Sequence, residues 1–339
     1  MKLVEKTLYF FIAALSAFES SAQTDSRRQW MPEVEGTLRA KFEYQTDIND
    51  SRFQVRDARV GVKGWLTDFV DYKLQINFSE KGKIRAHDLF ARLHFFDDQF
   101  QFTAGQFRVP ISVDAARSPH VRWFANRSFV GKQIGNVFDI GAKATYKPSR
   151  VPVTAEFGVF NGRSYSLADE VWLRHYLYVG HLKFKKAGFE VNAGAMTTKP
   201  QDVRIDMYDA TVAYNYQRFT AECEYMYKRF SDSSFSPVHA FNGMAMYALP
   251  VESKYLNQVR FLGRFDMMSD DSDGYVNDSG DIEMTDVARK RVTAGVTLGY
   301  YQKVNMELRF NYEKYFYDDG AEIGPSDHDK VVAELMINF

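Results

Sequence analysis

The stretch VNMELRFNYE, residues 304–313, shows the pattern that decides the fold. Its even-numbered residues, Val304 to Tyr312, are apolar or aromatic, and its odd-numbered residues are Asn, Glu or Arg. Side chains along a β-strand point alternately to the two faces of a sheet, whereas a helical period of 3.6 residues would scatter both sets around the helix. The stretch therefore predicts a strand with one apolar and one charged face, about as long as a membrane-spanning strand.

The same alternation recurs along the chain and predicts an all-β protein. It is clear at residues 72–78 and 138–146, and it is broken at residues 172–186 and 238–249, where a bulge or a missed turn would change the strand count. Sixteen strands are expected, at residues 33–46, 53–66, 69–79, 84–96, 99–109, 136–147, 151–162, 172–186, 188–198, 203–216, 218–230, 238–249, 255–268, 286–301, 303–317 and 329–339.

The lengths of the connections test this assignment independently. Every second connection is tight, near residues 67–68, 97–98, 148–150, 187, 217, 251–254 and 302. The others are generally longer, notably residues 110–135, 163–171, 269–285 and 318–328. Short periplasmic turns that alternate with longer outer loops are typical of an outer-membrane barrel. We therefore expect a transmembrane antiparallel β-barrel of about sixteen strands.

Composition agrees with a barrel in lipid. Aromatic residues make up 16% of the 339 residues, yet charged residues reach 26%, a mixture that suits lipid-facing and lumen-facing positions in alternation. No run of about eighteen apolar residues predicts a spanning helix. A net charge of -1 gives no reason to expect nucleic-acid binding.

The first residues have the features of a secretory signal. Lys2 and Lys6 precede an apolar run from Leu8 to Phe18, and small residues at 20–22 offer a cleavage site. We expect residues 1–22 to be a signal peptide and residues 23–339 to form the barrel, exported to the outer membrane.

Several short motifs resemble the phosphate-selective porin O/P family. They are GQF at residues 105–107 with Pro110, NRSF at 126–129, IGN at 134–136 with Gly141, and DYKLQINF at 71–78, with Asp88 where the family's fourth strand is acidic. The resemblance implies a sixteen-stranded outer-membrane barrel, usually a homotrimer, in contact with outer-membrane lipid. It also implies a long third outer loop, about residues 110–135, folded into the lumen as a constriction.

The sequence departs from that family where phosphate would bind. Its phosphate-selective members carry two adjacent arginines on the second strand, and the matching pair here is Arg56-Asp57. A first-strand arginine is replaced by Thr37. Phosphate sites use several guanidinium groups as forked donors, and a carboxylate would repel the anion. These departures argue against phosphate specificity.

The expected constriction is rich in cations. A pore selects by the charges at its narrowest point, and the loop together with Arg108 at its base supplies five Lys or Arg residues against the single acid Asp114. We therefore expect a mixed eyelet with a mild anion preference. An equally weighted alternative is that these arginines only pin the loop, as Arg127 could with Asp88 or Asp139. The candidate solute-contacting residues are Arg56, Asp57, Asp88, Arg92, Arg108, Arg117, Arg122, Arg127, Lys132 and Lys143.

Together these patterns favour a porin, a passive channel for small polar or charged solutes, small anions among them. The rival is a non-conducting barrel that binds a partner in a secretion or uptake complex. An enzyme is not expected, because the seven His residues lack a nucleophile context and His87 and His94 fall on opposite parities of one strand. No cofactor or metal is expected; the acidic stretch at 270–274 lacks the final Glu of a calcium loop.

Overall fold

The computed structural model describes residues 31–80, 83–162, 172–200, 203–276 and 282–339. The expected signal peptide and the expected connection at residues 163–171 lie outside the described residues. No helix in the described ranges is long and apolar enough to cross a membrane.

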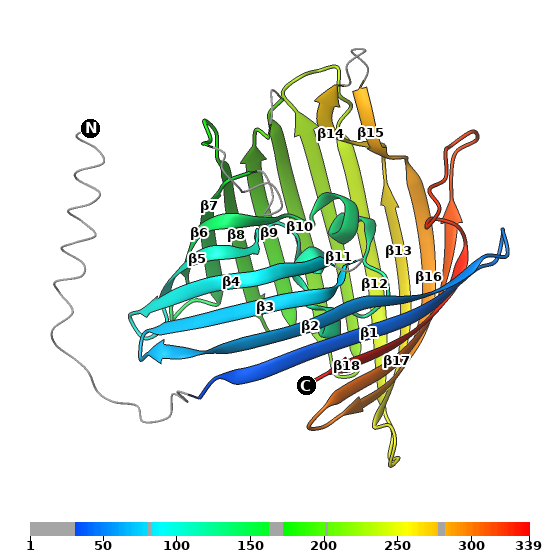
Figure 1. Ribbon diagram of the computed structural model, residues 1–339, viewed down its shortest axis with the longest axis horizontal. Coiled ribbons are helices and arrows are strands. Elements are labelled where there is room, and N and C mark those ends of the chain that lie inside the picture. The colour runs from blue at the N-terminus through cyan, green and yellow to red at the C-terminus, as the bar shows by residue number, and fades with distance from the viewer. Residues whose placement is uncertain (1–30, 81–82, 163–171, 201–202, 277–281) are drawn as a thin grey trace.

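Sixteen strands close into one antiparallel barrel, which confirms the expected fold class (Figure 1). The barrel strands are β1 (Glu33–Gln45), β2 (Ser51–Thr67), β3 (Val70–Glu80), β4 (Lys83–Phe95), β5 (Phe100–Arg108), β6 (Phe138–Tyr146), β7 (Val153–Phe160), β8 (Leu177–Lys186), β9 (Phe189–Thr198), β10 (Ile205–Tyr216), β11 (Phe219–Phe230), β12 (Val238–Pro250), β13 (Gln258–Met268), β16 (Arg289–Tyr301), β17 (Asn305–Phe316) and β18 (Lys330–Asn338). Each predicted strand overlaps one of them in the same order.

The first and last strands close the barrel. β1 pairs with β18 antiparallel, and near the chain end Gly36 and Phe339 exchange two backbone hydrogen bonds of 2.9 and 3.1 Å. A closed sheet leaves no edge whose N–H and C=O groups would face hydrocarbon without partners. Closure therefore leaves neither β1 nor β18 with an unpaired edge.

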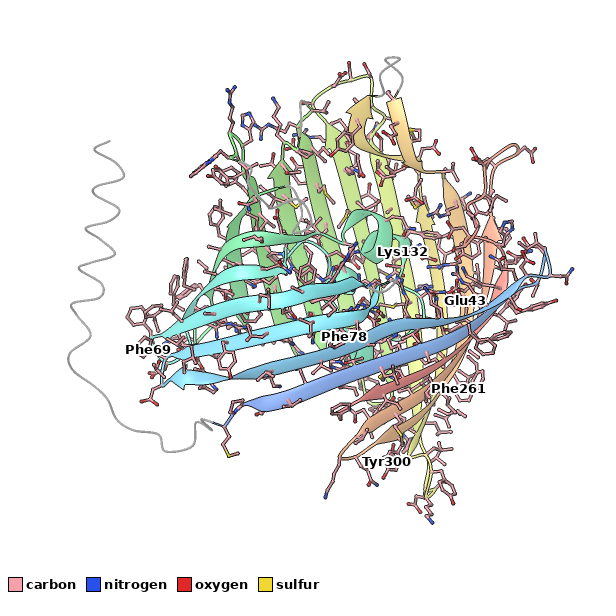
Figure 2. All side chains as sticks on the ribbon, in the orientation of Figure 1. Glu43, Phe69, Phe78, Lys132, Phe261 and Tyr300 are labelled. Atoms are coloured by element: carbon pink, nitrogen blue, oxygen red, sulfur yellow. The ribbon has the colours of Figure 1, made fainter. Side chains whose placement is uncertain are left out.

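The two faces of the wall separate apolar from charged side chains. On β17, Leu308, Phe310 and Tyr312 are exposed on the outer face, while Glu307 and Arg309 are buried on the inner face. Figure 2 labels further exposed aromatic side chains, Phe69, Phe78 and Phe261, which lie on different parts of the barrel. The period-two pattern of the sequence is thus the lipid and lumen alternation of a membrane barrel.

One outer connection contains structure that the sequence did not predict. Within the expected loop at residues 269–285, β14 (Asp271–Val276) and β15 (Ile282–Asp286) form a separate two-stranded sheet. The Lys228 ammonium at the end of β11 lies 2.8 Å from the Asp271 carboxylate, and Gly274 lies close to Ile205. The hairpin therefore folds toward the ends of β10 and β11. It is short and polar, which explains why alternation alone did not reveal it.

Gly105 occupies a position where no other residue fits. Its φ is +135°, and a Cβ built there would lie 2.2 Å from the Leu89 carbonyl oxygen on the neighbouring strand β4. We expect Gly105→Ala to lower the free energy of unfolding by about 1–3 kcal/mol, the usual cost of a strained backbone conformation. Urea unfolding in lipid vesicles measures it. Gly263→Ala is the control, because nothing lies within 4 Å of its Cβ position; equal midpoints for both variants would contradict the prediction.

Candidate functional site

The connection between β5 and β6, residues 109–137, lies inside the barrel. It contains α2 (Val113–Ala116), η1 (Pro119–Val121) and η2 (Val130–Ile134), and Figure 1 shows these helical turns enclosed by strands. Figure 2 labels Lys132 beside one of these turns. Hydrogen bonds join the segment to inner side chains of β1, β11, β13, β16 and β17. We call residues 109–137 the lumen loop.

Arginines of the wall hold the lumen loop by its backbone. Three arginines each donate to the backbone carbonyl oxygen of one of three consecutive loop residues. The pairs are Arg39 with Ala125 at 2.5 Å, Arg264 with Asn126 at 2.8 Å, and Arg291 with Arg127 at 2.7 Å. Charge-assisted hydrogen bonds of this kind are roughly twice as strong as neutral ones. The loop path is therefore set from the wall, and the loop side chains remain available for other contacts.

Wall carboxylates hold the other side of the lumen loop. Glu224 on β11 accepts hydrogen bonds from the Ser112 hydroxyl at 2.7 Å and from the N–H groups of Val113 and Asp114 at 2.8 and 3.2 Å. A carboxylate is favoured at the free N–H groups that begin a helix. Arg117 pairs with Glu222 on the same strand. Arg117 thus pins the lumen loop to a wall carboxylate.

The wall arginines are themselves neutralised by a chain of buried carboxylates. Arg39 lies 2.7 Å from Asp57 and 2.6 Å from Glu334, and Glu334 also accepts from Arg309 at 3.0 Å. Arg291 likewise pairs with Asp266 at 2.6 Å. Buried charges need such partners, because desolvation of an unpaired ion is costly. These arginines therefore add little free positive field to the lumen.

Two β-bulges bring adjacent residues to the same face of the wall. In β2, Asp57 stands opposite Arg39 and Val55 opposite Ala40, which leaves Arg56 as the extra residue. Strict alternation would place Arg56 and Asp57 on opposite faces, yet both line the lumen cavity. Bulges of this kind re-aim side chains beside functional sites.

The bulge in β4 corrects an expectation about histidines. Leu74 pairs with Leu89 and Ile76 with Ala86, so two residues of β4, 87 and 88, face Gln75 alone. Parity placed His87 and His94 on opposite faces, but the bulge shifts the parity between them and both are buried. His94 bonds Asp71 at 3.0 Å. The expectation that His87 and His94 lie on opposite faces of the strand was therefore wrong.

A cavity of about 780 Å³ lies between the lumen loop and the inner wall of β1 to β4. Its lining includes eleven Lys or Arg residues and three Asp or Glu residues. The cations are Lys41, Arg52, Arg56, Arg59, Arg85, Arg108, Arg122, Arg127, Lys132, Arg291 and Lys330, and the acids are Glu43, Asp57 and Asp327. This space is strongly cationic in a chain whose net charge is close to zero.

The opposite side of the lumen is filled with apolar side chains. Ile111, Phe129, Val130 and Ile134 of the lumen loop belong to one buried cluster with side chains of β9 to β13. The wall contributes Met196, Met207, Met226 and Met268. Methionine adapts to irregular gaps, which suits a wall that receives a loop. The loop therefore packs against this wall and leaves the cavity on the side of β1 to β4.

Four of the cavity cations form no ion pair with any described residue: Arg56, Arg122, Arg127 and Lys132. Arg122 is buried, and its hydrogen bond within the described part of the chain is from Nε to the Arg117 carbonyl oxygen at 3.4 Å. Arg127 donates to the Asn136 side-chain oxygen at 2.8 Å. Three of the four belong to the lumen loop, whose backbone is already held.

Burial and neighbouring cations make these charges unfavourable. Burial, with the guanidinium groups of Arg127 and Arg39 nearby, pushes the pKa of Arg122 well down from its ordinary value. Burial also lowers the pKa of Arg127 to about 10, and it lowers the pKa of Lys132. A guanidinium group stays protonated in proteins. These shifts therefore indicate positive charge that an anion in the cavity would stabilise.

Six of the ten predicted site residues line this cavity: Arg56, Asp57, Arg108, Arg122, Arg127 and Lys132. The other four lie outside its lining, each beside a residue of opposite charge. The partners are Lys73 for Asp88 at 3.7 Å, Asp71 for Arg92 at 3.7 Å, Glu222 for Arg117, and Glu156 for Lys143 at 2.5 Å. Arg127, considered above as a pin, donates to the Asn136 side-chain oxygen at 2.8 Å.

Sequence reasoning missed several residues of the site. Arg39 and Lys41 share the parity of Thr37 on β1, so alternation placed them on the inner face and could have identified them. Arg59 follows Asp57 by two residues and bonds it at 2.6 Å. No sequence signal marks the carbonyl groups of residues 125–127 as the acceptors that Arg39, Arg264 and Arg291 use.

Comparisons with known proteins agree with this geometry. The family described as phosphate-selective porin O and P matches residues 35–176, the part that carries the motifs and the lumen loop. This match confirms the resemblance. The barrel is that of an outer-membrane porin. A search of curated proteins found no match for this porin.

Solved porins share its fold at low sequence identity. Salmonella typhi OmpF in complex with daunomycin has a TM-score of 0.64 at 13% identity, and the alignment covers 91% of this chain and 97% of that one. The anion-selective porin from Comamonas acidovorans gives 0.62 at 10% identity, covering 91% and 98%. The channel DcaP of Acinetobacter baumannii gives 0.63 at 11%, covering 91% and 97%. Family and fold place this porin in the outer membrane and indicate a channel rather than an enzyme.

Proposed function

We propose that this porin is a passive channel with a mild preference for small anions, which pass through the cavity beside the lumen loop. One observation carries the proposal: Arg56, Arg122, Arg127 and Lys132 face the cavity without an ion pair to any described residue, while the wall arginines hold the loop through its carbonyl oxygens. A ring of unneutralised charge at a narrow passage attracts ions of the opposite sign.

The preference is mild because acids share the lining. The Glu43 carboxylate forms ion pairs with Lys41 and with Arg52, each at 2.6 Å. Asp327 also faces the cavity. Small cations would still enter in the screened parts of the lumen, since the field of an exposed charge falls off over a Debye length of about 10 Å at 0.1 M salt.

We also propose that inorganic phosphate has no special site here. Asp57 does not stand alone; it binds Arg39 at 2.7 Å and Arg59 at 2.6 Å. Two guanidinium groups on β1 and β2 are thus used by a carboxylate of the protein itself. A phosphate ion would have to compete with Asp57 for their forked donors.

Reversal potential in a KCl gradient across a planar bilayer tests the proposal. We expect stable open steps and a potential that leans toward chloride. Phosphate added to the bath should reduce the current no more than sulfate of equal ionic strength. A potassium-leaning potential would contradict the anion preference, and selective block by phosphate would contradict the absence of a phosphate site. Without any conductance, a partner-binding barrel would be the better account.

Trimeric assembly is proposed on a different basis. One structural relative, OmpT of Vibrio cholerae, is described in a trimer form, with a TM-score of 0.59 at 12% identity over 91% of this chain and 98% of that one. We propose that this porin also forms a homotrimer. Its mass in detergent, measured by light scattering with the detergent contribution subtracted, distinguishes three copies from one.

A further inference from the structure

The outer connection between β17 and β18 reaches the mouth of the lumen cavity. Its residues Ser326 and Asp327 line the cavity together with the wall and the lumen loop. Side chains at the ends of β1, β17 and β18 hold the backbone of this connection. The Gln45 amide donates to the Pro325 carbonyl oxygen at 2.8 Å, the Tyr317 hydroxyl donates to that of Asp327 at 2.6 Å, and the Lys330 ammonium donates to that of Ser326. We call residues 318–329 the lid.

Asp327 is the most loosely held acid of the cavity. Among the described residues, the acids that line it are Glu43, Asp57 and Asp327. Glu43 and Asp57 each form two ion pairs of 2.6 or 2.7 Å with cations of the wall. In the described ranges, the ion-pair partner of Asp327 is Arg289, which lies 3.6 Å from its carboxylate. This distance exceeds that of a charge-assisted hydrogen bond, so the Asp327 contact is the weakest of the five.

Arg289 does not depend on Asp327 for its charge balance. Arg289 begins β16 and is buried, and its guanidinium group also pairs with Asp286 at 2.5 Å. The same group lies over the Phe129 ring of the lumen loop, 4.9 Å from the ring centre. If the Asp327 carboxylate moved away, Asp286 would still neutralise Arg289, and no unpaired buried charge would remain. The carboxylate of the lid can therefore leave at small cost.

The Asp327 charge also acts on the lumen loop. Lys132 lines the same cavity and has no ion-pair partner among the described residues. Burial lowers the pKa of Lys132, and attraction by the Asp327 carboxylate opposes that shift. A solute anion that is attracted to Lys132 would therefore meet a carboxylate of the protein that is attracted to the same ammonium group.

We propose that Asp327 is a built-in competitor for the permeating anion, which enters the cavity by displacing the Asp327 carboxylate from beside Arg289 and Lys132. This inference rests on the proposed anion pathway and adds the residue that sets how tightly an anion is held there. Conduction requires a site that is favourable enough for an ion to enter and weak enough for it to leave. By competing for the cations, Asp327 weakens the hold on the anion and keeps it from being trapped.

Block of the chloride current by sulfate tests this in planar bilayers. Asp327→Asn keeps the shape of the side chain, removes its charge and leaves the backbone contacts of the lid in place. We expect the sulfate concentration that halves the current to fall by about threefold, in line with the small worth of a partly exposed ion pair. The matched control, Asp319→Asn, removes the same charge from an exposed position of the same lid outside the cavity lining. It should be blocked as wild type is.

A double-mutant cycle separates competition from a general change in field. If Asp327 competes for Lys132, Asp327→Asn should alter the half-blocking concentration less in Lys132→Gln than in the otherwise wild-type chain. A strictly additive cycle, or an equal effect of Asp319→Asn, would overturn the proposal. The two proposals can also fail separately. A potassium-leaning reversal potential of the wild type would overturn the anion pathway and this inference with it, whereas a chloride-leaning wild type with unchanged block in Asp327→Asn would overturn this inference alone.

Discussion

Replacing Arg122 and Arg127 together by glutamine is expected to lower the chloride-to-potassium permeability ratio by about threefold or more. A unit charge at about 4 Å is worth roughly 4 kcal/mol at an effective dielectric constant of 20, before screening by salt. Both residues line the cavity and neither has an ion-pair partner among the described residues. Their removal should therefore change the field that a permeating ion meets. Reversal potentials in a KCl gradient measure the ratio.

The control removes two charges from outside the lumen. Arg204→Gln with Lys290→Gln changes net charge by the same amount at exposed positions, and its permeability ratio should match wild type. If the Arg122 and Arg127 variant kept the wild-type ratio while the channel stayed open, selectivity would have to arise elsewhere. A ratio that fell equally in the control would indicate a net-charge effect without a specific site.

The substitution at Arg122 also leads to a prediction about the free energy of unfolding. Burial and neighbouring arginines depress the pKa of Arg122, so its charge opposes the folded state. Arg122→Gln is therefore expected to leave the free energy of unfolding unchanged or to raise it, as is common where function requires an unfavourable charge. Urea unfolding of Arg122→Gln in vesicles, followed by tryptophan fluorescence, checks this. A clear loss of stability would show that Arg122 holds the loop in place.

Arg39→Met is expected to lower the free energy of unfolding by about 3–5 kcal/mol, the usual cost of breaking a buried ion pair from one side. The Arg39 side chain is 1% exposed and joins Asp57, Glu334 and the Ala125 carbonyl oxygen. Methionine would leave two buried carboxylates with one partner fewer and would release one anchor of the lumen loop. Urea unfolding in vesicles gives the loss, and increased current noise would report the freed loop.

A double-mutant cycle separates this network from simple packing. In Arg39→Met with Glu334→Met, the carboxylate that lost its partner is also removed, so the combined loss should be smaller than the sum of the two single losses. A strictly additive result would mean that the Arg39 and Glu334 charges do not depend on each other. Their distance of 2.6 Å makes that outcome inconsistent with the network described here.

Alternation in the sequence was sufficient for the strands and for most of the wall. Leu308 and Arg309 face lipid and lumen as their parity predicts. Alternation failed where a bulge adds a residue, as at Arg56 in β2 and at residues 87 and 88 in β4. A single extra residue reverses every later inward assignment on a strand. Nothing in the local pattern marks where that residue is inserted.

The sequence by itself determined a sixteen-stranded membrane barrel and a loop rich in cations, because both depend on local period, connection length and composition. Only the tertiary structure decided which of those cations are free. Arg117 meets Glu222, 105 residues away, and is neutralised, whereas Arg122 and Arg127 have no ion-pair partner in the described ranges, and Arg39, Arg264 and Arg291 hold the loop through carbonyl oxygens. Every residue has a carbonyl group, so the sequence does not show which ones the wall will bind.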